Sequence, residues 1–223
     1  MNVLIIHASQ EKQSFGSAMK DAMLEELQKN GHSVTVSDLY EMKFNPTGGK
    51  DDFTQLGNEE YFNFMLEQKN AAEKGLFASD VQSEIEKVKK ADLLIINTPV
   101  WWFSTPAIVK GWFDRVLATG VAWDFNGIYD KGLLRGEKAM MSVTTGGSKN
   151  LYEKEGVHGA TIEEILYPIT HGTLYFCGME VLPTFVAWST FQAGDDGRKK
   201  YLEEIALRMK SVESEAPMEK HSF

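Results

Sequence analysis

Three large aromatic residues follow a short apolar run near the middle of the chain. Residues 93–96 are apolar without alternation, which is typical of a strand buried on both faces, and Pro99 ends the run because it has no N–H for a sheet. Trp101, Trp102 and Phe103 come next. Such a cluster could form a flat wall for a planar ligand, although aromatics more often serve burial in a core or a dimer contact. Both interpretations stay open on this cluster alone.

Residues 7–16 form a second candidate site, because this loop carries hydroxyl groups and opens a predicted helix. Ser14 stands at the position of an N-cap. The free N–H groups and the dipole of a helix N-terminus can hold a phosphate, while the simpler interpretation is that Ser14 only caps its helix. The loop has neither G-x-G-x-x-G nor G-x-x-x-x-G-K-[ST], which excludes the dinucleotide fingerprint and the P-loop.

A third loop combines small residues with polar groups. Thr144-Thr-Gly-Gly-Ser148 follows an apolar segment, and its glycines let the backbone approach a ligand closely. Tyr152 and His158 lie in the same connection. If the three loops share one edge of a sheet, they supply an anion site, an aromatic wall and a polar edge. That combination is typical of a flavin site and is more specific than any single loop.

These loops need strands that end side by side. Apolar runs alternate with amphipathic segments, so we expect an α/β protein with a doubly wound parallel sheet. The expected fold is flavodoxin-like, with five strands in the order 2-1-3-4-5 and helices on both faces, and ligands bind at the carboxyl ends of such strands. The predicted strands are residues 3–6, 33–37, 93–96, 138–144 and 180–187, and the predicted helices are residues 14–30, 79–90, 107–117, 160–176 and 195–212.

Residues 1–212 are expected to form a single flavin-binding domain. An insertion at about residues 38–78 is long for a connection in such a fold, and insertions of this length are usually functional or partly helical. The pattern near Tyr61 predicts one helix within it. The charged tail, residues 213–223, is expected to be loose.

Composition narrows the classes of function. The 223 residues carry a net charge of −9, which argues against a general nucleic-acid binder. The single cysteine, Cys177, allows no internal disulfide, so a cytoplasmic location is expected. No stretch reaches the roughly 18 apolar residues of a membrane span, and the first residues lack the pattern of a signal peptide. The five histidines show no metal-ligand spacing.

The sequence resembles the NAD(P)H:quinone oxidoreductase family, the DT-diaphorase-like flavoproteins, over nearly its whole length. Many short blocks match in the same order along the chain. The matching stretches are Ser14-Phe15, Ala18-Met-Lys20, Ser37-Asp-Leu-Tyr40, Phe44-Asn-Pro46, Pro106-Ala-Ile108, Lys110-Gly-Trp-Phe113, Tyr129-Asp-Lys-Gly132, Thr144-Thr-Gly-Gly-Ser148, His158-Gly159 and Phe176-Cys-Gly178.

The resemblance implies a flavin-dependent two-electron reductase, usually a homodimer with a site at each subunit interface. NAD(P)H would reduce the flavin, and a quinone or similar flat acceptor would then reoxidise it in a ping-pong cycle. Tyr152 and His158 match residues near the flavin, where a phenol or imidazole donor stabilises negative charge. The implied cofactor-binding residues are Ser9, Ser14, Phe15 and Gly16 at the phosphate, Pro99, Val100, Trp101, Trp102 and Phe103 at the ring, Thr144, Thr145, Gly146, Gly147 and Tyr152 at its polar edge, Asn63 at the adenosine, and Arg198 at the diphosphate. The implied acceptor residues, which include positions supplied by the partner subunit, are Trp123, Phe125 and Phe176.

Four positions depart from the family pattern. Ser9 stands where the family has histidine and Gly16 where it has asparagine. Both positions touch the family's phosphate site, so FMN stays open as the alternative to the FAD that the resemblance implies. Trp123 and Phe125 replace two tyrosines, so the preference for acceptors should differ.

Two other functions stay open. A non-enzymatic electron carrier of flavodoxin type would stabilise a one-electron-reduced flavin and would not turn over NAD(P)H. A regulatory flavoprotein subunit, of the kind that some relatives provide to ion-efflux channels, would bind a partner and turn over slowly. The sequence specifies neither the physiological acceptor nor the choice between NADH and NADPH.

Overall fold

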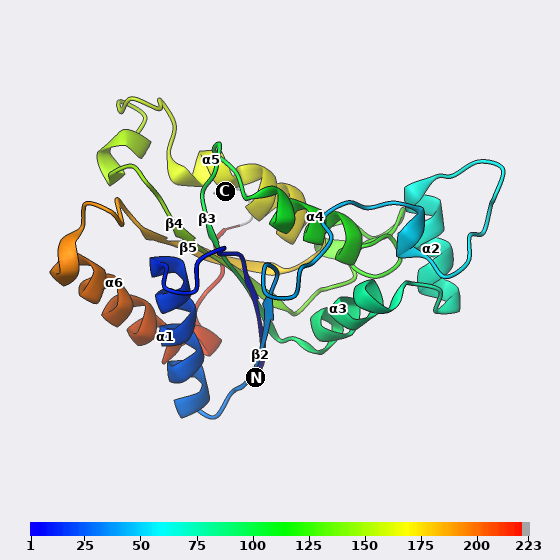
Figure 1. Ribbon diagram of the computed structural model, residues 1–223, viewed down its shortest axis with the longest axis horizontal. Helices are drawn as coiled ribbons and strands as arrows, with labels where there is room; N and C mark the ends of the chain where they lie inside the picture. Colours follow the sequence, from blue (N-terminus) through cyan, green and yellow to red (C-terminus); the bar gives the residue numbers. More distant parts are fainter. Residues whose placement is uncertain (220–223) are drawn as a thin grey trace.

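The computed structural model describes residues 1–219, and its centre is one parallel sheet. The strands are β1 (Asn2–His7), β2 (Ser33–Asp38), β3 (Leu93–Pro99), β4 (Lys138–Thr144) and β5 (Glu180–Ala187). Their order is β2-β1-β3-β4-β5, and every neighbouring pair is parallel. The predicted flavodoxin-like fold and strand order are therefore confirmed (Figure 1).

The two faces of the sheet bury alternate side chains of the same strands. On one face, Ile5 and Ile95 pack with residues of α1 (Phe15–Lys29) and α6 (Gly194–Met209), two helices that lie side by side (Figure 1). On the other face, Ile6 and Ile96 pack with residues of α3 (Ser79–Lys90), α4 (Ala107–Val116) and α5 (Ile162–Ile169). Because successive side chains of the central strands are buried on opposite faces of the sheet, these strands are apolar at every position.

The last long helix before β5 changes its geometry partway. A helix over residues 160–176 was expected, with a kink at Pro168. Thr161 caps α5 through a capping box with Glu164, and the chain then continues as a π-helix over Thr170–Tyr175. Pro168 lies inside α5, and the Thr173 hydroxyl donates to its carbonyl at 3.2 Å. This wider turn delivers Phe176 to the end of the helix.

The insertion extends away from the sheet, at the right of Figure 1. It contains a 3-10 turn (Lys50–Asp52) and α2 (Phe64–Lys74). The helix predicted near Tyr61 thus begins at Phe64, because the Asn63 side chain accepts the N–H of Leu66 and caps it.

A buried arginine of α4 joins the insertion to the domain. The Arg115 guanidinium donates to Asp52 Oδ1 at 2.9 Å, to the Asn45 carbonyl at 2.8 Å and to Asp80 Oδ2 at 2.9 Å. Arg115 and Asp52 are each only 2% exposed, so this ion pair is shielded from water. The guanidinium also lies over the Phe44 ring.

The segment after α6 lies against the domain as far as the structure describes it. The Glu215 carboxylate pairs with Arg208, and the Met218 N–H donates to the Val181 carbonyl at 2.8 Å. In the tail that we expected to be loose, Glu215 and Met218 thus contact the domain, and residues 220–223 lie outside the described residues. No helix of residues 1–219 has both the length and the apolar character that crossing a bilayer requires.

Candidate functional site

A cavity of about 510 Å³ opens at the carboxyl edge of the sheet, where the sequence predicted a site. Residues of the β1–α1, β3–α4 and β5–α6 connections meet there, together with Tyr40 after β2 and Thr144 at the end of β4. Eight of the predicted cofactor residues line the cavity, namely Ser9, Ser14, Phe15, Gly16, Pro99, Trp101, Thr144 and Arg198.

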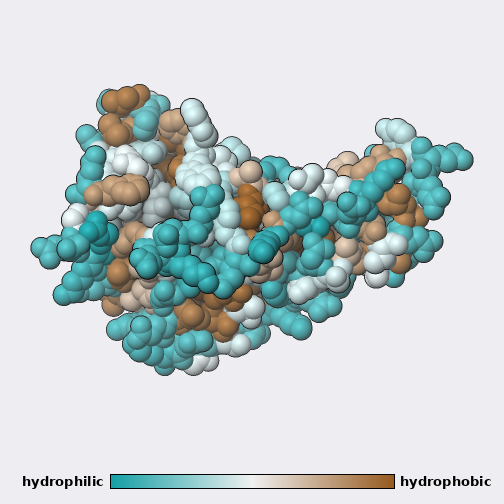
Figure 2. Space-filling view, in the orientation of Figure 1, coloured by the Kyte–Doolittle hydropathy of each residue, from teal (hydrophilic) through white to brown (hydrophobic). Residues whose placement is uncertain are grey.

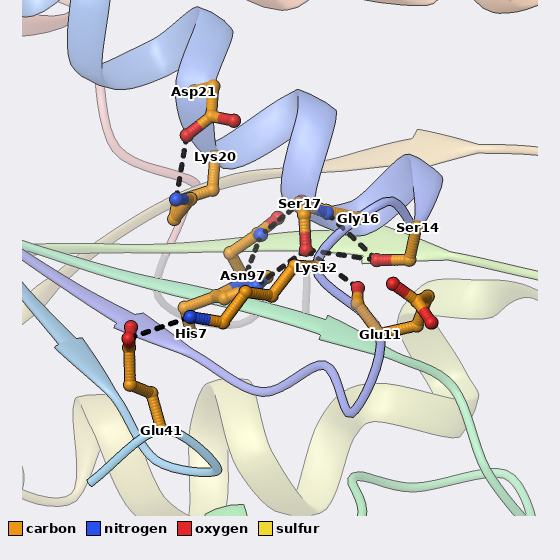
Figure 3. A network of polar contacts seen from close by, with 10 residues as sticks. All are labelled: His7, Glu11, Lys12, Ser14, Gly16, Ser17, Lys20, Asp21, Glu41 and Asn97. Atoms are coloured by element: carbon orange, nitrogen blue, oxygen red, sulfur yellow. Dashed lines mark hydrogen bonds and ion pairs between the residues drawn. The ribbon is translucent and has the colours of Figure 1, made fainter.

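Hydroxyl groups and free N–H groups at the start of α1 form one end of this cavity. The Ser14 hydroxyl lies 2.6 Å from that of Ser9. It lies 3.0 Å from the Ser17 hydroxyl and accepts the Ser17 N–H as the N-cap (Figure 3). The N–H groups of Phe15 and Gly16 have no partner within the described chain. Unpaired N–H groups and hydroxyls at a helix N-terminus are the donors that a phosphate requires.

One acidic residue also lines this end of the cavity. The Glu11 carboxylate accepts the N–H of Gln13 at 2.9 Å, so one of its oxygens is bonded to the loop itself. The Glu11 carbonyl accepts from the hydroxyls of Ser9 and Ser17. Glu11 therefore helps to fix the loop around the serine hydroxyls.

A buried histidine of β1 is hydrogen-bonded to the first turn of α1, which this loop precedes. His7 is 1% exposed, and burial lowers its pKa, so the neutral ring is the stable form. Its Nδ1 accepts from the Asn97 side-chain amide at 2.9 Å, which leaves Nε2 to donate to the Ser17 hydroxyl at 3.2 Å. The same amide donates to the Gly16 carbonyl at 2.8 Å. His7 and Asn97 thereby connect β1 and β3 to the first turn of α1.

The aromatic loop after β3 is a tight two-residue turn. Trp101 and Ser104 exchange N–H···O bonds of 2.9 and 3.1 Å across it. Trp102 and Phe103 hold φ angles of 50° and 58°, a conformation that turns usually give to glycine or asparagine. Their N–H groups have no partner within the described chain, and Trp102 is 95% exposed. Strain of this kind persists where surrounding structure or a ligand requires the geometry.

The predicted catalytic pair lies together beside this turn. The ring centroids of Tyr152 and His158 are 4.7 Å apart, and the Phe103 ring lies 5.1 Å from that of His158. Burial raises the pKa of Tyr152, so its phenol stays protonated at neutral pH. No residue of the described chain bonds the phenol OH, which leaves it free to donate to a ligand.

The small-residue loop follows the same edge. The Val100 N–H donates to the Thr144 carbonyl at 2.9 Å, and the Thr145 hydroxyl donates to the Gly147 carbonyl at 2.8 Å. Gly147 lies against the Tyr152 ring, where a Cβ would come within 3.1 Å of a ring carbon. Gly146 has open space beside it.

The predicted acceptor residues form a separate group. The Trp123 ring lies 5.4 Å from that of Phe176 and 6.0 Å from that of Phe125. Trp123 and Phe176 line a second cavity, of about 450 Å³, with residues of α2 and α4. Within the described residues no ring of this group contacts Tyr152, so the two groups of predicted residues lie apart in one chain.

Arg198 and Asn63, which the resemblance implies at the diphosphate and the adenosine, have different surroundings. Arg198 lines the first cavity, where its guanidinium donates to the Thr190 carbonyl at 3.3 Å and pairs with Asp195. Asn63 caps α2 and lines neither cavity. A single chain therefore does not bring Asn63 to the phosphate end.

Sequence reasoning missed the contribution of the β5–α6 connection. Thr190 and Phe191 line the first cavity, and Phe191 is 92% exposed. The ring of Trp188 lies 5.1 Å from that of Tyr152. The signal was available, because this connection follows a strand that ends at the same edge as the other three. Within residues 1–219 no cluster of three His, Cys, Asp or Glu side chains could hold a metal ion.

Comparison with known proteins identifies relatives along nearly the whole chain. A family profile described as "Flavodoxin-like fold" matches residues 1–211. The chain is 43% identical to the human "Ribosyldihydronicotinamide dehydrogenase [quinone]", covering 97% of this chain and 94% of that protein. It is 42% identical to the guinea-pig "NAD(P)H dehydrogenase [quinone] 1", covering 96% of this chain and 78% of that protein.

A solved structure agrees with these matches. The structure of a putative quinone reductase from Klebsiella pneumoniae has a TM-score of 0.92 to this fold, with 35% sequence identity over 97% of this chain and 86% of the other. The chain therefore belongs to the flavodoxin-like NAD(P)H:quinone oxidoreductase family.

Proposed function

We propose that this protein is a flavin-dependent oxidoreductase that transfers two electrons from NAD(P)H to a quinone or a similar flat acceptor. The observation that carries the proposal is the cavity at the carboxyl edge of the sheet, which Phe15 and Gly16 line at its phosphate end and Trp101 lines at the aromatic turn. The rest of that turn contacts His158 through Phe103, and His158 contacts the Tyr152 phenol ring. When bound there, a flavin supplies the two-electron chemistry between the two substrates.

The residues fit the parts of a flavin in turn. The N–H groups of Phe15 and Gly16, with the hydroxyls of Ser9 and Ser14, would hold phosphate. The N–H groups of the Trp102–Phe103 turn and the small residues Thr144, Thr145, Gly146 and Gly147 would hold the ring. FAD is the cofactor we expect, with FMN as the alternative, since Arg198 could bind a second phosphate.

Tyr152 and His158 would stabilise the negative charge on the reduced cofactor and would not carry the transferred hydride themselves. Negative charge develops on the cofactor when it accepts hydride, and a fixed donor nearby lowers the energy of that state. The Tyr152 phenol suits this role because it stays protonated and has a free OH. His158 packs edge-on against Tyr152 and would act as a second donor or hold the phenol in place.

We further propose that the working form is a homodimer. Trp123, Phe125 and Phe176 lie together but apart from Tyr152, so an acceptor site that uses both groups needs a second copy of the chain. Apolar side chains that would suit such an interface are exposed on α2, including Met65 and Leu66. Figure 2 shows hydrophobic surface at this end of the molecule, at the right. A cytoplasmic location is consistent with the single buried free thiol, Cys177.

The names of the relatives suggest two reductants. The relatives matched over 94% of their length are named for ribosyldihydronicotinamide, and those matched over 78% are named for NAD(P)H. Measuring the rate of flavin reduction with NADH, NADPH and ribosyldihydronicotinamide would separate these possibilities. NAD(P)H is the reductant we propose.

Stopped-flow reduction of the flavin tests the roles of Tyr152 and His158. The double variant Tyr152→Phe with His158→Gln should retain flavin but should reduce it about 100-fold more slowly, because two donors to developing charge are lost. Reduction at the wild-type rate would remove both residues from the mechanism. Absence of reduction in the wild-type protein itself would favour the electron-carrier or regulatory-subunit functions.

A further inference from the structure

We propose, building on the proposed function, that Trp188 is a positioning residue that holds the Tyr152 phenol in its orientation beside His158 and the aromatic turn. Trp188 follows β5 directly and was not among the residues that the sequence suggested. Its ring centroid lies 5.1 Å from that of Tyr152, with 50° between the ring planes. It reaches Tyr152 from a connection that is distant in the sequence.

The backbone around Trp188 is fixed to the loop that precedes Tyr152. The Thr145 N–H donates to the Ala187 carbonyl at 3.0 Å, and the Ser189 N–H donates to the Gly147 carbonyl at 3.1 Å. The Thr190 N–H then donates back to the Thr145 carbonyl at 3.3 Å. These bonds extend the pairing of β4 with β5 beyond the ends of both strands, so Trp188 cannot shift independently of this loop.

Three neighbours then restrict the Tyr152 ring. His158 lies at 4.7 Å between centroids and Trp188 at 5.1 Å. Gly147 approaches so closely that a Cβ there would lie 3.1 Å from ring carbon Cε2 of Tyr152. The ring therefore has one well-supported orientation, although no residue of the described chain bonds its OH. Packing, rather than hydrogen bonding, sets where the phenol points.

The surroundings of Tyr152 depend on the same contact. Burial raises the pKa of Tyr152, and the Trp188 ring supplies part of the apolar surface around it. Removing the indole should both free the ring to rotate and expose the phenol to water. A residue that only stabilised the fold would not change the titration of Tyr152 while the fold stays intact.

The test compares Trp188→Leu with the conservative Trp188→Phe, each made in the wild-type protein and in Tyr152→Phe. With the wild-type phenol present, Trp188→Leu should slow flavin reduction about tenfold, because misplacing a reacting group by a fraction of an ångström is costly. Trp188→Phe should stay within about threefold of wild type, since a flat ring is kept. In the Tyr152→Phe background, Trp188→Leu should change the rate less than about twofold, because no phenol remains to be positioned.

A second readout does not require turnover. Ultraviolet difference absorbance between each protein and its Tyr152→Phe counterpart follows the ionisation of Tyr152 alone. The pKa of Tyr152 should fall toward its ordinary value in Trp188→Leu and should stay raised in Trp188→Phe. An unchanged titration in a folded Trp188→Leu protein would overturn the positioning role, and so would equal slowing in both backgrounds.

These outcomes separate the two claims. If the wild-type protein binds no flavin or is not reduced, the proposed function fails, yet the titration still decides whether Trp188 positions Tyr152. If Trp188→Leu does not fold, Gly147→Ala displaces the same ring from its other side and should also shift the Tyr152 titration. An unmoved titration in a folded Gly147→Ala protein would contradict the restricted ring.

Discussion

A negative charge at Gly16 should weaken phosphate binding without harming the fold. Gly16 lies in the first turn of α1 and lines the cavity, and its N–H has no partner within the described chain. The nearest heavy atom to an added Cβ is the Ser14 hydroxyl at 3.9 Å, so a side chain fits. Gly16→Asp would therefore place a carboxylate beside the bound phosphate, and Gly16→Asn provides a neutral control of the same shape.

The magnitude follows from Coulomb's law. At about 5 Å separation and an effective dielectric constant near 20, two unit charges repel by about 3 kcal/mol, and screening by salt would leave about 2 kcal/mol. Since about 1.4 kcal/mol corresponds to a tenfold change, FMN affinity should fall at least about 30-fold. An acidic residue in the first turn stabilises a helix by about 0.3–1 kcal/mol, so the melting temperature should not drop.

Fluorescence titration of the apo-protein with FMN, FAD and riboflavin is the appropriate assay. Gly16→Asp should lose affinity for FMN and FAD and retain that for riboflavin, which has no phosphate, while Gly16→Asn should lose little for any of them. Equal FMN affinity of the two variants would refute the phosphate cradle. An equal loss for riboflavin would show that the substitution damaged the cavity instead.

Three further outcomes follow from the structure. Arg115→Met should destabilise the protein by about 3–5 kcal/mol, because Asp52 stays buried without its partner, and calorimetry should show a melting temperature lower by about 10 °C. Burial raises the pKa of Glu137 from 4.5 to about 7, so its proton is held more tightly in the folded protein and stability should fall as pH rises from about 4.5 through 7. Urea unfolding at several pH values should show this loss, about 1–2 kcal/mol after allowing for solvent exposure, and Glu137→Gln should remove it. Phe125→Ala should raise the KM for a quinone and leave the rate of flavin reduction by NAD(P)H unchanged, and slower flavin reduction in this variant would contradict an acceptor-only role for Phe125.

The fold was predictable because its central signal is local. Residues 93–96 are apolar at every position, and the structure shows why, since Ile95 and Ile96 face different helix layers. The three loops that we predicted around the cavity followed from the rule that parallel strands end at one edge. Tyr40 after β2 and the β5–α6 connection obey the same rule, but neither Tyr40 nor Trp188 has a local pattern that marks a ligand site.

Other features depend on contacts that no local pattern encodes. The amide of Asn97 joins His7 to Gly16 across distant parts of the chain, and nothing in the spacing of these residues predicts it. Residues 213–219 contact the domain through Arg208, Lys138 and the Val181 carbonyl, all distant in the sequence or outside any local pattern. Trp123 lies apart from Tyr152 within one chain, and nothing in the spacing of these two residues indicates that separation.

Anaerobic reduction of the purified protein tests the central claim most directly. The protein should show a flavin spectrum that bleaches directly to the two-electron-reduced form when NADH or NADPH is added, and a quinone should restore the oxidised spectrum. Releasing and identifying the flavin in the same experiment decides between FAD and FMN. A flavin that stays oxidised in the presence of both nicotinamides, or a protein that binds no flavin after reconstitution, would contradict the proposed oxidoreductase.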